Sequence, residues 1–355
     1  MKLRRAVYRV LLAGALSGCG GSGGGHTVTP AFRVLDAPSG FVPTAFSDSG
    51  ALIGNGFQTA TVGFTLYLQS AYRPAGGKLA ILPTLNGSPE IYAGGINGND
   101  QIVGFCNLEP VAWLHPQSSA PETIPWPTGF GEQLKEGTFL QTEFINNHDQ
   151  ILGNATNGDA QTDTAYLWRT PASVPAIVGP AQFQVTGFNN QGIAVGYLSV
   201  PNRNEFYKVD VNGNLSTDLH FVGPNQNMVC VIDDSGTIAL GESPESVSNG
   251  FDSDLVVISP SGTSSVVLNS AYPVAINSRG DIVGQQIIPS SGANDNPFLY
   301  KPGRPIINLN TFIPASEGFT KAYVTGINDQ GEVLGWGAKG NENVSFIIRL
   351  PSGDY

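Results

Sequence analysis

The chain is poor in the side chains on which most catalytic and metal-binding sites depend. It contains only three cysteines and four histidines among 355 residues. His26, His115, His148 and His220 lie far apart, without the spacing of metal ligands, so we expect no transition-metal site. No G-x-S-x-G elbow, phosphate-binding glycine loop or H-E-x-x-H helix occurs. The sequence therefore predicts no catalytic residue and no cofactor, although carboxylates from distant segments could converge without leaving a linear motif.

Charged residues are scarce too, at 13% of the chain, about half the usual share. The balance is acidic, with 17 Lys and Arg against 28 Asp and Glu and a net charge of −11. Because an acidic surface repels phosphate groups, nucleic acid and anionic lipid headgroups are not expected partners. A surface of uncharged polar side chains is typical of an exported protein.

Helical periodicity is also missing. Beyond the N-terminal segment, no window repeats apolar residues at i, i+3, i+4 and i+7. Instead, 45 glycines and 25 prolines interrupt the chain at intervals typical of turns. We therefore expect an all-β protein.

One nine-residue pattern occurs seven times. The copies are FSDSGALIG (46–54), INGNDQIVG (96–104), INNHDQILG (145–153), FNNQGIAVG (188–196), IDDSGTIAL (232–240, with its glycine one place late), INSRGDIVG (276–284) and INDQGEVLG (327–335). Successive copies start 50, 49, 43, 44, 44 and 51 residues apart. A period in this range indicates one supersecondary unit per repeat, as in propellers and solenoids.

Each copy has the features of a β-hairpin. An apolar residue ends a strand, and a short polar residue that favours a type I turn follows it. Three residues later the chain needs a left-handed conformation, which glycine adopts freely and aspartate tolerates. The residues predicted at this position are Gly50, Asp100, Asp149, Gly192, Gly236, Gly280 and Gly331.

Further strands follow each hairpin. Third strands are predicted at 64–68, 111–114, 164–168, 206–210, 254–259, 297–301 and 345–350. Short fourth strands are predicted at 79–85, 122–126, 175–179, 215–219, 265–269 and 305–309, which is one fewer than the number of repeats. The segment FRVLD (32–36), before the first hairpin, can supply the missing strand.

Pairing of this segment with the last repeat would close a ring and remove exposed sheet edges. We therefore predict that residues 31–355 form a single seven-bladed β-propeller of four-stranded antiparallel blades, closed by the N-terminal strand. An open solenoid is the alternative, but it would need capping repeats, which neither end of this region provides.

The N-terminal segment is typical of an exported lipoprotein. A basic stretch, MKLRRAVYR, is followed by the apolar VLLAGAL and by small residues that end at Cys19. LSGC (16–19) resembles the lipobox of bacterial lipoproteins, whose cysteine becomes the acylated N-terminus. We expect residues 1–18 to be a signal peptide and 19–30 to form the lipidated cysteine and a glycine-rich flexible tether. An ordinary secretory signal is the alternative.

A lipid on Cys19 would make the membrane a partner and would place the protein in the bacterial cell envelope. Gly20, rather than an aspartate, follows the cysteine, which favours the outer membrane or cell surface. Removal of residues 1–18 takes away four basic and no acidic residues, so 13 basic residues remain against 28 acidic ones. The remaining cysteines, Cys106 and Cys230, fall in blades that do not touch, so we expect two buried thiols rather than a disulfide.

The repeats resemble those of the HAF repeat family of predicted bacterial extracellular proteins, which couples A-I-N-x-x-G-x-I-V-G to H-A-F-L-W. AINSRGDIVG (275–284) and GINDQGEVLG (326–335) match the first half, and TAYLW (164–168) and PFLYK (297–301) match the second. No histidine precedes the alanine, and the fifth repeat is degenerate. The resemblance covers about residues 31–350 and implies an exported repeat protein, without carrying over any catalytic residue.

The topology also predicts where a ligand would bind. Loops between second and third strands share a face with the connectors between blades, such as 127–139 and 310–321, and such loops often carry binding residues. The candidate side chains on this loop face are Asp159, Asp163, Glu205, Glu242, Asp252, Asp254, Asp295 and Glu342. NGDAQTD (157–163) and FDSD (251–254) loosely resemble calcium loops, so weak Ca²⁺ binding stays open, although EF-hand spacing is missing. Solvated loops without a ligand are the alternative.

Among the aromatic residues, Trp126 and Trp336 are candidates for stacking on a sugar, whereas Trp113 and Trp168 are expected in blade cores. The sequence favours an exported, lipid-anchored propeller that acts as a non-catalytic recognition module for a polysaccharide or protein. One alternative is an envelope polysaccharide hydrolase or lyase whose carboxylates converge near the central channel. Another is a structural subunit of an envelope assembly.

Overall fold

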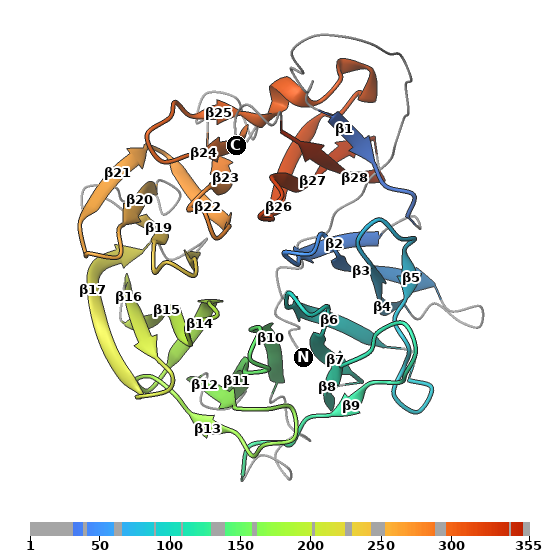
Figure 1. The fold of residues 1–355 in the computed structure, drawn as a ribbon, viewed down its shortest axis with the longest axis vertical. Coiled ribbons are helices and arrows are strands. Elements are labelled where there is room, and N and C mark those ends of the chain that lie inside the picture. Colours follow the sequence, from blue (N-terminus) through green and yellow to red (C-terminus); the bar gives the residue numbers. More distant parts are fainter. Residues whose placement is uncertain are drawn as a thin grey trace.

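The structure, a computed structural model, describes most of the chain after its first thirty residues. The described ranges are 31–37, 41–59, 66–88, 90–107, 109–128, 139–157, 162–200, 203–223, 229–242, 253–287, 296–340 and 342–350. They form seven four-stranded antiparallel sheets around a central axis (Figure 1). Within these ranges, no helix has the length and apolar character needed to cross a membrane.

Each sheet is one blade, and its strands follow one another outward from the axis. Blade 1 comprises β2 (Phe41–Phe46), β3 (Leu52–Thr59), β4 (Leu66–Arg73) and β5 (Ala80–Ile81). Blade 2 comprises β6 (Ile91–Ile96), β7 (Ile102–Cys106), β8 (Glu109–Trp113) and β9 (Glu122–Thr123). Blade 3 comprises β10 (Phe139–Ile145), β11 (Ile151–Asn157), β12 (Thr162–Trp168) and β13 (Ala176–Ile177). Blade 4 comprises β14 (Phe183–Phe188), β15 (Ile193–Val200), β16 (Arg203–Asp210) and β17 (Leu215–Gly223). Blade 5 comprises β18 (Cys230–Ile232), β19 (Ile238–Glu242), β20 (Asp254–Ile258) and β21 (Ser264–Leu268).

Blades 6 and 7 include the two described 3-10 helices in their connector. Blade 6 comprises β22 (Ala271–Ile276), β23 (Ile282–Gln286), β24 (Asn296–Tyr300) and β25 (Ile307–Asn308). The helices η3 (Leu309–Phe312) and η4 (Ala315–Glu317) lead to blade 7, which comprises β26 (Lys321–Ile327), β27 (Glu332–Lys339), β28 (Glu342–Arg349) and, from the other end of the chain, β1 (Ala31–Val34).

Blade 7 closes the ring as predicted. β1 pairs antiparallel with β28, with Phe32 opposite Ile348 and Val34 opposite Phe346, and Figure 1 shows the N-terminal strand beside the C-terminal one. The ring of Phe32 packs at 5.4 Å from that of Phe346. The first and last described strands therefore share one sheet, and no open blade is left at the junction.

The hairpin turns have the conformation that their residues require. In every blade the fourth turn residue has a positive φ, from 61° at Asp100 and Asp149 to 92° at Gly236. Its N–H donates to the carbonyl oxygen of the first turn residue, as in Gly50 N to Ser47 O at 3.0 Å. These turns bring the chain back into the ladder after a type I bend.

The last residue of the repeat is a glycine for a second reason, which is a β-bulge in the innermost strand opposite it. Six blades shift register there, as between Ala93 and Gly95 in blade 2. At the bulge the inner strand approaches the second strand so closely that a Cβ on Gly104 would lie 1.9 Å from the carbonyl oxygen of Tyr92. Blade 5 has Leu240 at this position and pairs Cys230 with Leu240 in an unbroken register. The displaced glycine of the fifth repeat therefore marks a blade without the bulge.

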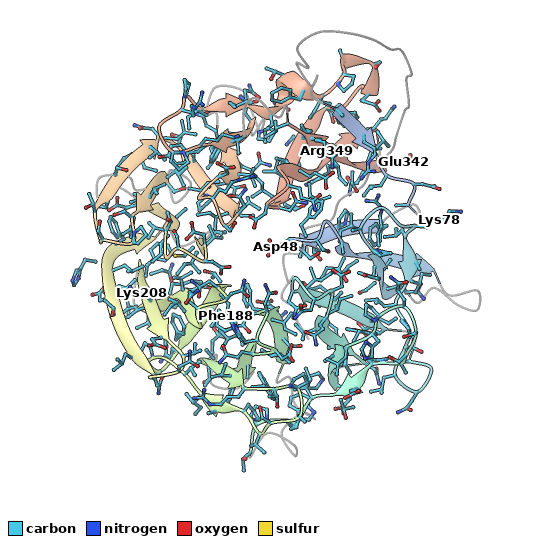
Figure 2. All side chains as sticks on the ribbon, in the orientation of Figure 1. Asp48, Lys78, Phe188, Lys208, Glu342 and Arg349 are labelled. Carbon is cyan, nitrogen blue, oxygen red and sulfur yellow. The ribbon has the colours of Figure 1, made fainter. Side chains whose placement is uncertain are left out.

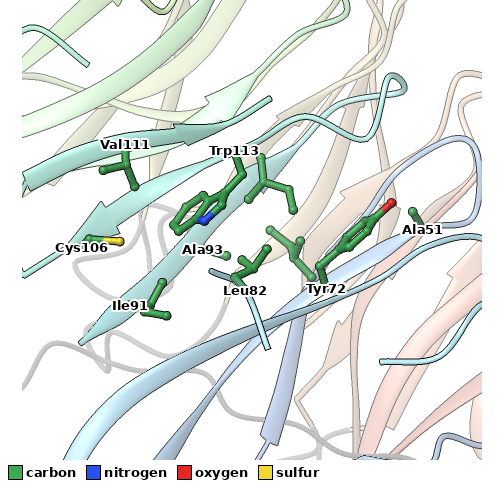
Figure 3. Close-up of a cluster of buried hydrophobic side chains, with 10 residues drawn as sticks. Ala51, Tyr72, Leu82, Ile91, Ala93, Cys106, Val111 and Trp113 are labelled. Atoms are coloured by element: carbon green, nitrogen blue, oxygen red, sulfur yellow. The ribbon is translucent and has the colours of Figure 1, made fainter. Parts of the chain in front are cut away.

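The hydrophobic core lies between neighbouring blades. Figure 3 shows one such layer, in which Tyr72 and Leu82 of blade 1 pack against Ile91 and Trp113 of blade 2. The Trp113 indole donates from Nε1 to the carbonyl oxygen of Pro83 at 2.8 Å, so the buried ring keeps its hydrogen bond. Cys106 and Cys230 are buried free cysteines in separate core layers.

Several strand predictions were wrong in extent. The third strand of blade 1 was expected at 64–68, but β4 continues to Arg73. Its polar Ser70 is buried because its hydroxyl donates to Ile91 O at 3.0 Å, a contact between blades that no local pattern indicates. Four of the outermost strands have only two residues in the ladder. The rest of those segments turns to pack inward, as the buried Leu82 and Ile124 do.

Candidate functional site

The predicted loop face is only partly described. Asp159, Asp252 and Asp295 lie outside the described residues, as does 129–138 of the connector 127–139. Asp163 lies on β12, Glu205 on β16, Glu242 on β19, Asp254 on β20 and Glu342 on β28. The structure thus distributes the described candidates over blades 3, 4, 5 and 7.

Two of these residues meet within one blade. Glu242 and Asp254 are direct cross-strand partners at the ends of β19 and β20. Burial raises the pKa of Glu242, and the neighbouring Asp254 carboxylate raises it further. Like charges placed opposite each other in a ladder repel, so this pair favours a bound proton or cation. Among the described residues, no group of three or more His, Cys, Asp and Glu is placed to hold a metal ion.

A half-buried acid, Glu143, lies at the junction of blades 3 and 4. Burial raises the pKa of Glu143 to about 7, while a hydrogen bond from Asn154 opposes the shift. Nearby, the amide of Gln184 donates to Asp163 and accepts from the hydroxyl of Tyr197. No local pattern indicates Glu143, because its surroundings include Tyr197 of the next blade.

The aromatic candidates divide as expected between core and blade ends. Trp113 and Trp168 are fully buried. Trp336 is half-buried and stacks on Tyr323, with ring centroids 4.1 Å apart and planes 20° apart. Trp126 donates from Nε1 to the carboxylate of Glu109 at 2.8 Å. Trp336 and Trp126 thus lie near blade ends, but each already has a protein partner.

A cavity lies on the other face, at the end of the central channel where the hairpin turns meet. It has a volume of about 170 Å³. We call it the channel mouth. It is lined by Phe46, Ser47, Asp48, Ile96, Asn97, Gly98, Ile145, Asn146, Asn147, Phe188, Asn189, Asn190, Ile232, Asp233, Asp234, Ile276, Asn277, Ser278 and Ile327. These are first and second turn residues of the repeats and the apolar residues before them, so the repeat itself builds the cavity.

The first polar residue of each turn ties one blade to the next. Asn97 Nδ2 donates to Asn146 O at 3.0 Å, and Asn146 Nδ2 donates in turn to Asn189 O at 3.3 Å. Asn189 Nδ2 continues to Asp233 O at 2.8 Å, and Asn277 Nδ2 donates to Asn328 O at 3.2 Å. Each of these four bonds runs from one blade to the following one, so four of the seven blade junctions share the same directed bond.

The second turn residues form a parallel set of bonds. Gly98 N donates to Asn147 Oδ1 at 2.6 Å, and Asn147 N donates to Asn190 Oδ1 at 2.7 Å. Asn190 N donates to Asp234 Oδ1 at 2.8 Å, and Ser278 N donates to Asp329 Oδ1 at 2.9 Å. The rim residues therefore hold their neighbours' side chains in fixed positions.

The wall changes character where an aspartate replaces the asparagine. Asp233 is 4% exposed, and its Oδ1 accepts from Thr237 N and the Ser235 hydroxyl, both at 2.8 Å. Its Oδ2 points toward the turn of blade 6, where a Cβ built on Gly280 would lie 3.6 Å away. A carboxylate has no proton to donate, so Asp233 cannot repeat the amide-to-carbonyl bond made by its counterparts.

Blades 1 and 2 use a different clamp. The carboxylate of Asp100 accepts from Ser49 Oγ at 2.8 Å, from Ser47 Oγ at 3.2 Å and from the Tyr72 hydroxyl at 2.9 Å. Burial, together with this bond, raises the pKa of Tyr72 to about 12. Asp100, considered from the sequence only as a turn residue, thus also joins two blades.

Asp48 does not join two blades by hydrogen bonds among the described residues, as Asp100 does. Figure 2 shows its side chain close to the axis of the ring. Partial removal from water raises the pKa of its carboxyl, and the carboxylates of Asp329 and Asp234 raise it further. Carboxylates of blades 5 and 7 therefore act on Asp48 of blade 1, and Asp48 and Asp234 both line the channel mouth.

Comparison with known proteins bears on the fold. No model of a known protein family matches the chain, and no curated protein matches its sequence. Similar solved structures include YCF48 bound to D1 peptide, with 10% identity, a TM-score of 0.52 and coverage of 95% of this chain and 97% of that one. The Dos1 propeller has 12% identity and a TM-score of 0.53, with coverage of 87% and 92%. Oligogalacturonate lyase in complex with manganese has 8% identity and a TM-score of 0.56, with coverage of 92% and 98%.

These similarities, at low identity, show the fold alone. The chain is a β-propeller by class. In its own form it is a propeller of seven four-stranded blades, closed by the N-terminal strand, with a polar cavity built from the turns of its repeats.

Proposed function

We propose that the protein is a non-catalytic recognition module that is held at the bacterial cell envelope by a lipid on Cys19 and binds a protein or polysaccharide at the channel mouth. The observation that carries this proposal is the cavity of about 170 Å³ whose walls are turns of successive blades joined by hydrogen bonds. Such walls need little ordering when a ligand binds, and preorganised polar groups contribute to affinity for that reason.

The solved structures support this proposal by analogy of fold. One similar propeller, YCF48, was determined with a peptide bound. Fold likeness alone does not carry function from one protein to another. The analogy therefore supports a protein ligand, while the residues that would bind it are argued from this chain.

A polysaccharide hydrolase or lyase is the second candidate. It is favoured by the raised pKa of Asp48 beside two other carboxylates, since acids with a perturbed pKa are common at catalytic sites. One observation weighs against it. Asp234 and Asp329 already accept hydrogen bonds from Asn190 and Ser278.

Binding and turnover can be separated in one experiment. The full-length protein in detergent would be offered arrays of envelope polysaccharides, peptidoglycan fragments and peptides from envelope proteins. We expect saturable binding to one class of ligand, which is recovered unchanged by mass spectrometry. Release of shortened or unsaturated sugars would contradict a non-catalytic role.

Membrane attachment has its own test. Palmitate labelling of cells that express the full chain should mark the protein, and a Cys19→Ser variant should lose both the label and the membrane association. The same propeller with a Cys106→Ser change serves as the control, because Cys106 is buried in a blade core. A label that persists in Cys19→Ser would overturn the anchor.

A further inference from the structure

The channel mouth has an apolar interior behind a polar rim. Every blade contributes the last residue of its innermost strand to the lining of the cavity. These residues are Phe46, Ile96, Ile145, Phe188, Ile232, Ile276 and Ile327. Because each of them precedes its turn in the chain, this apolar ring lies further inside the channel than the second turn residues. A ligand that fills the cavity therefore needs an apolar surface on its inner side.

The second turn residues form the rim and are accessible to water. Asp48, Asn147 and Ser278 are exposed, and Asn190 and Asp234 are half-buried. The first turn residues behind them are buried, and four of them donate a side-chain N–H to the next blade. Polar contacts with a ligand therefore fall mainly to the rim.

Two amides of the rim have N–H groups to spare. Asn147 Oδ1 accepts from Gly98 N at 2.6 Å, which orients the amide, and its Nδ2 has no acceptor among the described residues. Asn190 Nδ2 donates to Asp234 Oδ2 at 2.7 Å. An amide nitrogen carries two hydrogens, so Asn190 keeps one after this bond. Blades 3 and 4 thus offer hydrogen-bond donors to a ligand.

The same rim offers acceptors from blades 1 and 5. Figure 2 places Asp48 beside the axis of the ring, and its carboxylate has no donor within the described ranges. Asp234 accepts one bond at each carboxylate oxygen, both from Asn190, at 2.8 and 2.7 Å. A carboxylate offers about four lone-pair sites, so Asp234 can accept further bonds. Donors and acceptors therefore face one opening from four blades.

This mixture selects a neutral ligand whose groups both donate and accept. An ammonium or a guanidinium only donates, so it would leave the N–H groups of Asn147 and Asn190 unpaired. An anion only accepts, and the carboxylates of Asp48 and Asp234 would repel it. A hydroxyl group donates one hydrogen bond and accepts others, so it can pair with either kind of rim residue.

The size of the cavity indicates how many hydroxyl groups can meet the rim. Its volume of about 170 Å³ is close to that of an engineered cavity of about 150 Å³ that holds benzene, so one six-membered ring fits. A sugar ring carries C–H groups on its faces and several hydroxyls around its edge, which can reach several blades at once. A peptide group has one N–H and one carbonyl, which together reach two rim positions.

We propose that the channel mouth binds one neutral sugar ring at the end of a polysaccharide chain. Its C–H groups would contact the apolar ring, and its hydroxyls would bond to Asp48, Asn147, Asn190 and Asp234. A cavity that holds a single ring leaves the rest of the chain outside, which is why a chain end is the part recognised. This inference rests on the proposed recognition function and narrows its ligand.

The test uses the full-length protein in a detergent that has no sugar headgroup. Saturation-transfer NMR would measure binding of the methyl glycosides of glucose, galactose, mannose and N-acetylglucosamine. The methyl glycoside of glucuronic acid and n-butylammonium chloride are the charged controls. We expect at least one neutral glycoside to bind more tightly than both controls. No binding of any neutral glycoside, or tighter binding of a charged probe, would overturn the proposal.

Two variants with matched controls locate the site. Asp48→Asn removes a charged acceptor and should weaken glycoside binding about tenfold or more. Asn147→Asp keeps the oxygen that accepts from Gly98 N but loses the Nδ2 donor, and should weaken binding about fivefold. Glu122→Gln and Asn269→Asp make the same changes at exposed sites outside the channel mouth and should leave the affinity unchanged. Equal affinities in all four variants would overturn the proposal.

Trisaccharides test the recognition of a chain end. A trisaccharide that carries the bound sugar at an end should bind, and one that carries it only in the middle should not. Equal binding of the two would contradict the proposal. The envelope-ligand array separates this inference from the proposed function. A peptide that binds while no glycoside does would overturn the sugar assignment and leave the recognition function standing, whereas no ligand of any class would overturn both.

Discussion

The side-chain amide of Asn55 pairs with both backbone polar groups of Ala93 in the next blade. Its Nδ2 donates to Ala93 O at 3.0 Å, and its Oδ1 accepts from Ala93 N at 2.9 Å. Asn154 makes the same pair of bonds to Val185 at 3.1 and 3.0 Å. The amide thus extends the hydrogen bonding of an inner strand across the gap between blades, and it does so after the bulge, where the second strand is closest.

Replacing Asn55 with alanine should therefore weaken the junction of blades 1 and 2. Loss of the amide leaves the buried carbonyl of Ala93 without its donor Asn55 Nδ2 and leaves the Ala93 N–H with only the Ser70 hydroxyl as acceptor, at 2.8 Å, which costs about 1–3 kcal/mol. A lower urea midpoint for Asn55→Ala, measured by circular dichroism, would show this. Asn269→Ala, at an exposed site, is the control and should leave the midpoint unchanged. An unchanged urea midpoint in Asn55→Ala would contradict the conclusion that Asn55 stabilises the junction of blades 1 and 2.

The bulge glycine gives a second prediction. In Gly104→Ala the new Cβ would lie 1.9 Å from Tyr92 O, so the backbone must move and the protein should lose several kcal/mol of stability or fail to fold, as overpacked sites do. Gly241 of blade 5, where the register is unbroken, has its nearest atoms at 3.4 Å. Gly241→Ala should fold with a melting temperature near that of wild type. Similar melting temperatures for the two variants would contradict the role assigned to the bulge.

Much of this fold could be predicted from the sequence because its determinants are local. The turn residues of each repeat fix the hairpins, and FRVLD supplies the missing strand, so closure through Phe32 and Ile348 follows from counting strands. The extent of β4 could not be predicted, since Ser70 becomes a buried strand residue through a hydrogen bond to Ile91 of another blade.

The channel mouth was missed for a related reason. Its residues were recognised as turn formers, and the predicted ligand face was the opposite, loop-bearing one. The signal was present in the second position of each turn, where Asp48, Asp234 and Asp329 occur beside Asn147 and Asn190. Only the closed ring brings those positions together, so reading each repeat by itself hides the site.

The stabilities of two substitutions can be compared at one left-handed turn position. Gly280 has a φ of +75°, which a β-branched side chain adopts at a cost of about 1–3 kcal/mol. Gly280→Val should lower the urea midpoint accordingly, whereas Gly280→Asn should cost less because asparagine tolerates this conformation. The reverse order of the two variants would rule out backbone strain as the cause.

Glu143 predicts a dependence of stability on pH. Burial raises its pKa from 4.5 to about 7, so between these values the folded state holds a proton that the unfolded state has lost. Stability should therefore fall as the pH rises from about 4.5 to 7 and level off above 7, by at most about 3 kcal/mol. Glu143→Gln should remove this contribution. The measurement is the difference between the free energies of unfolding in urea of wild type and Glu143→Gln across this pH range. A difference that does not change with pH would contradict the raised pKa of Glu143.

The central claim is that the face of the hairpin turns, rather than the loop face, meets the ligand. A photo-crosslinking amino acid can be placed in the full-length protein at His148, an exposed residue in a turn beside the channel mouth, or at Glu317, a partly exposed residue of η4 at the other end of β26. Irradiation of cells that express each variant should give a discrete crosslinked product from position 148 and none from position 317. A product from position 317 alone would contradict the central claim and would indicate that the ligand binds on the loop face.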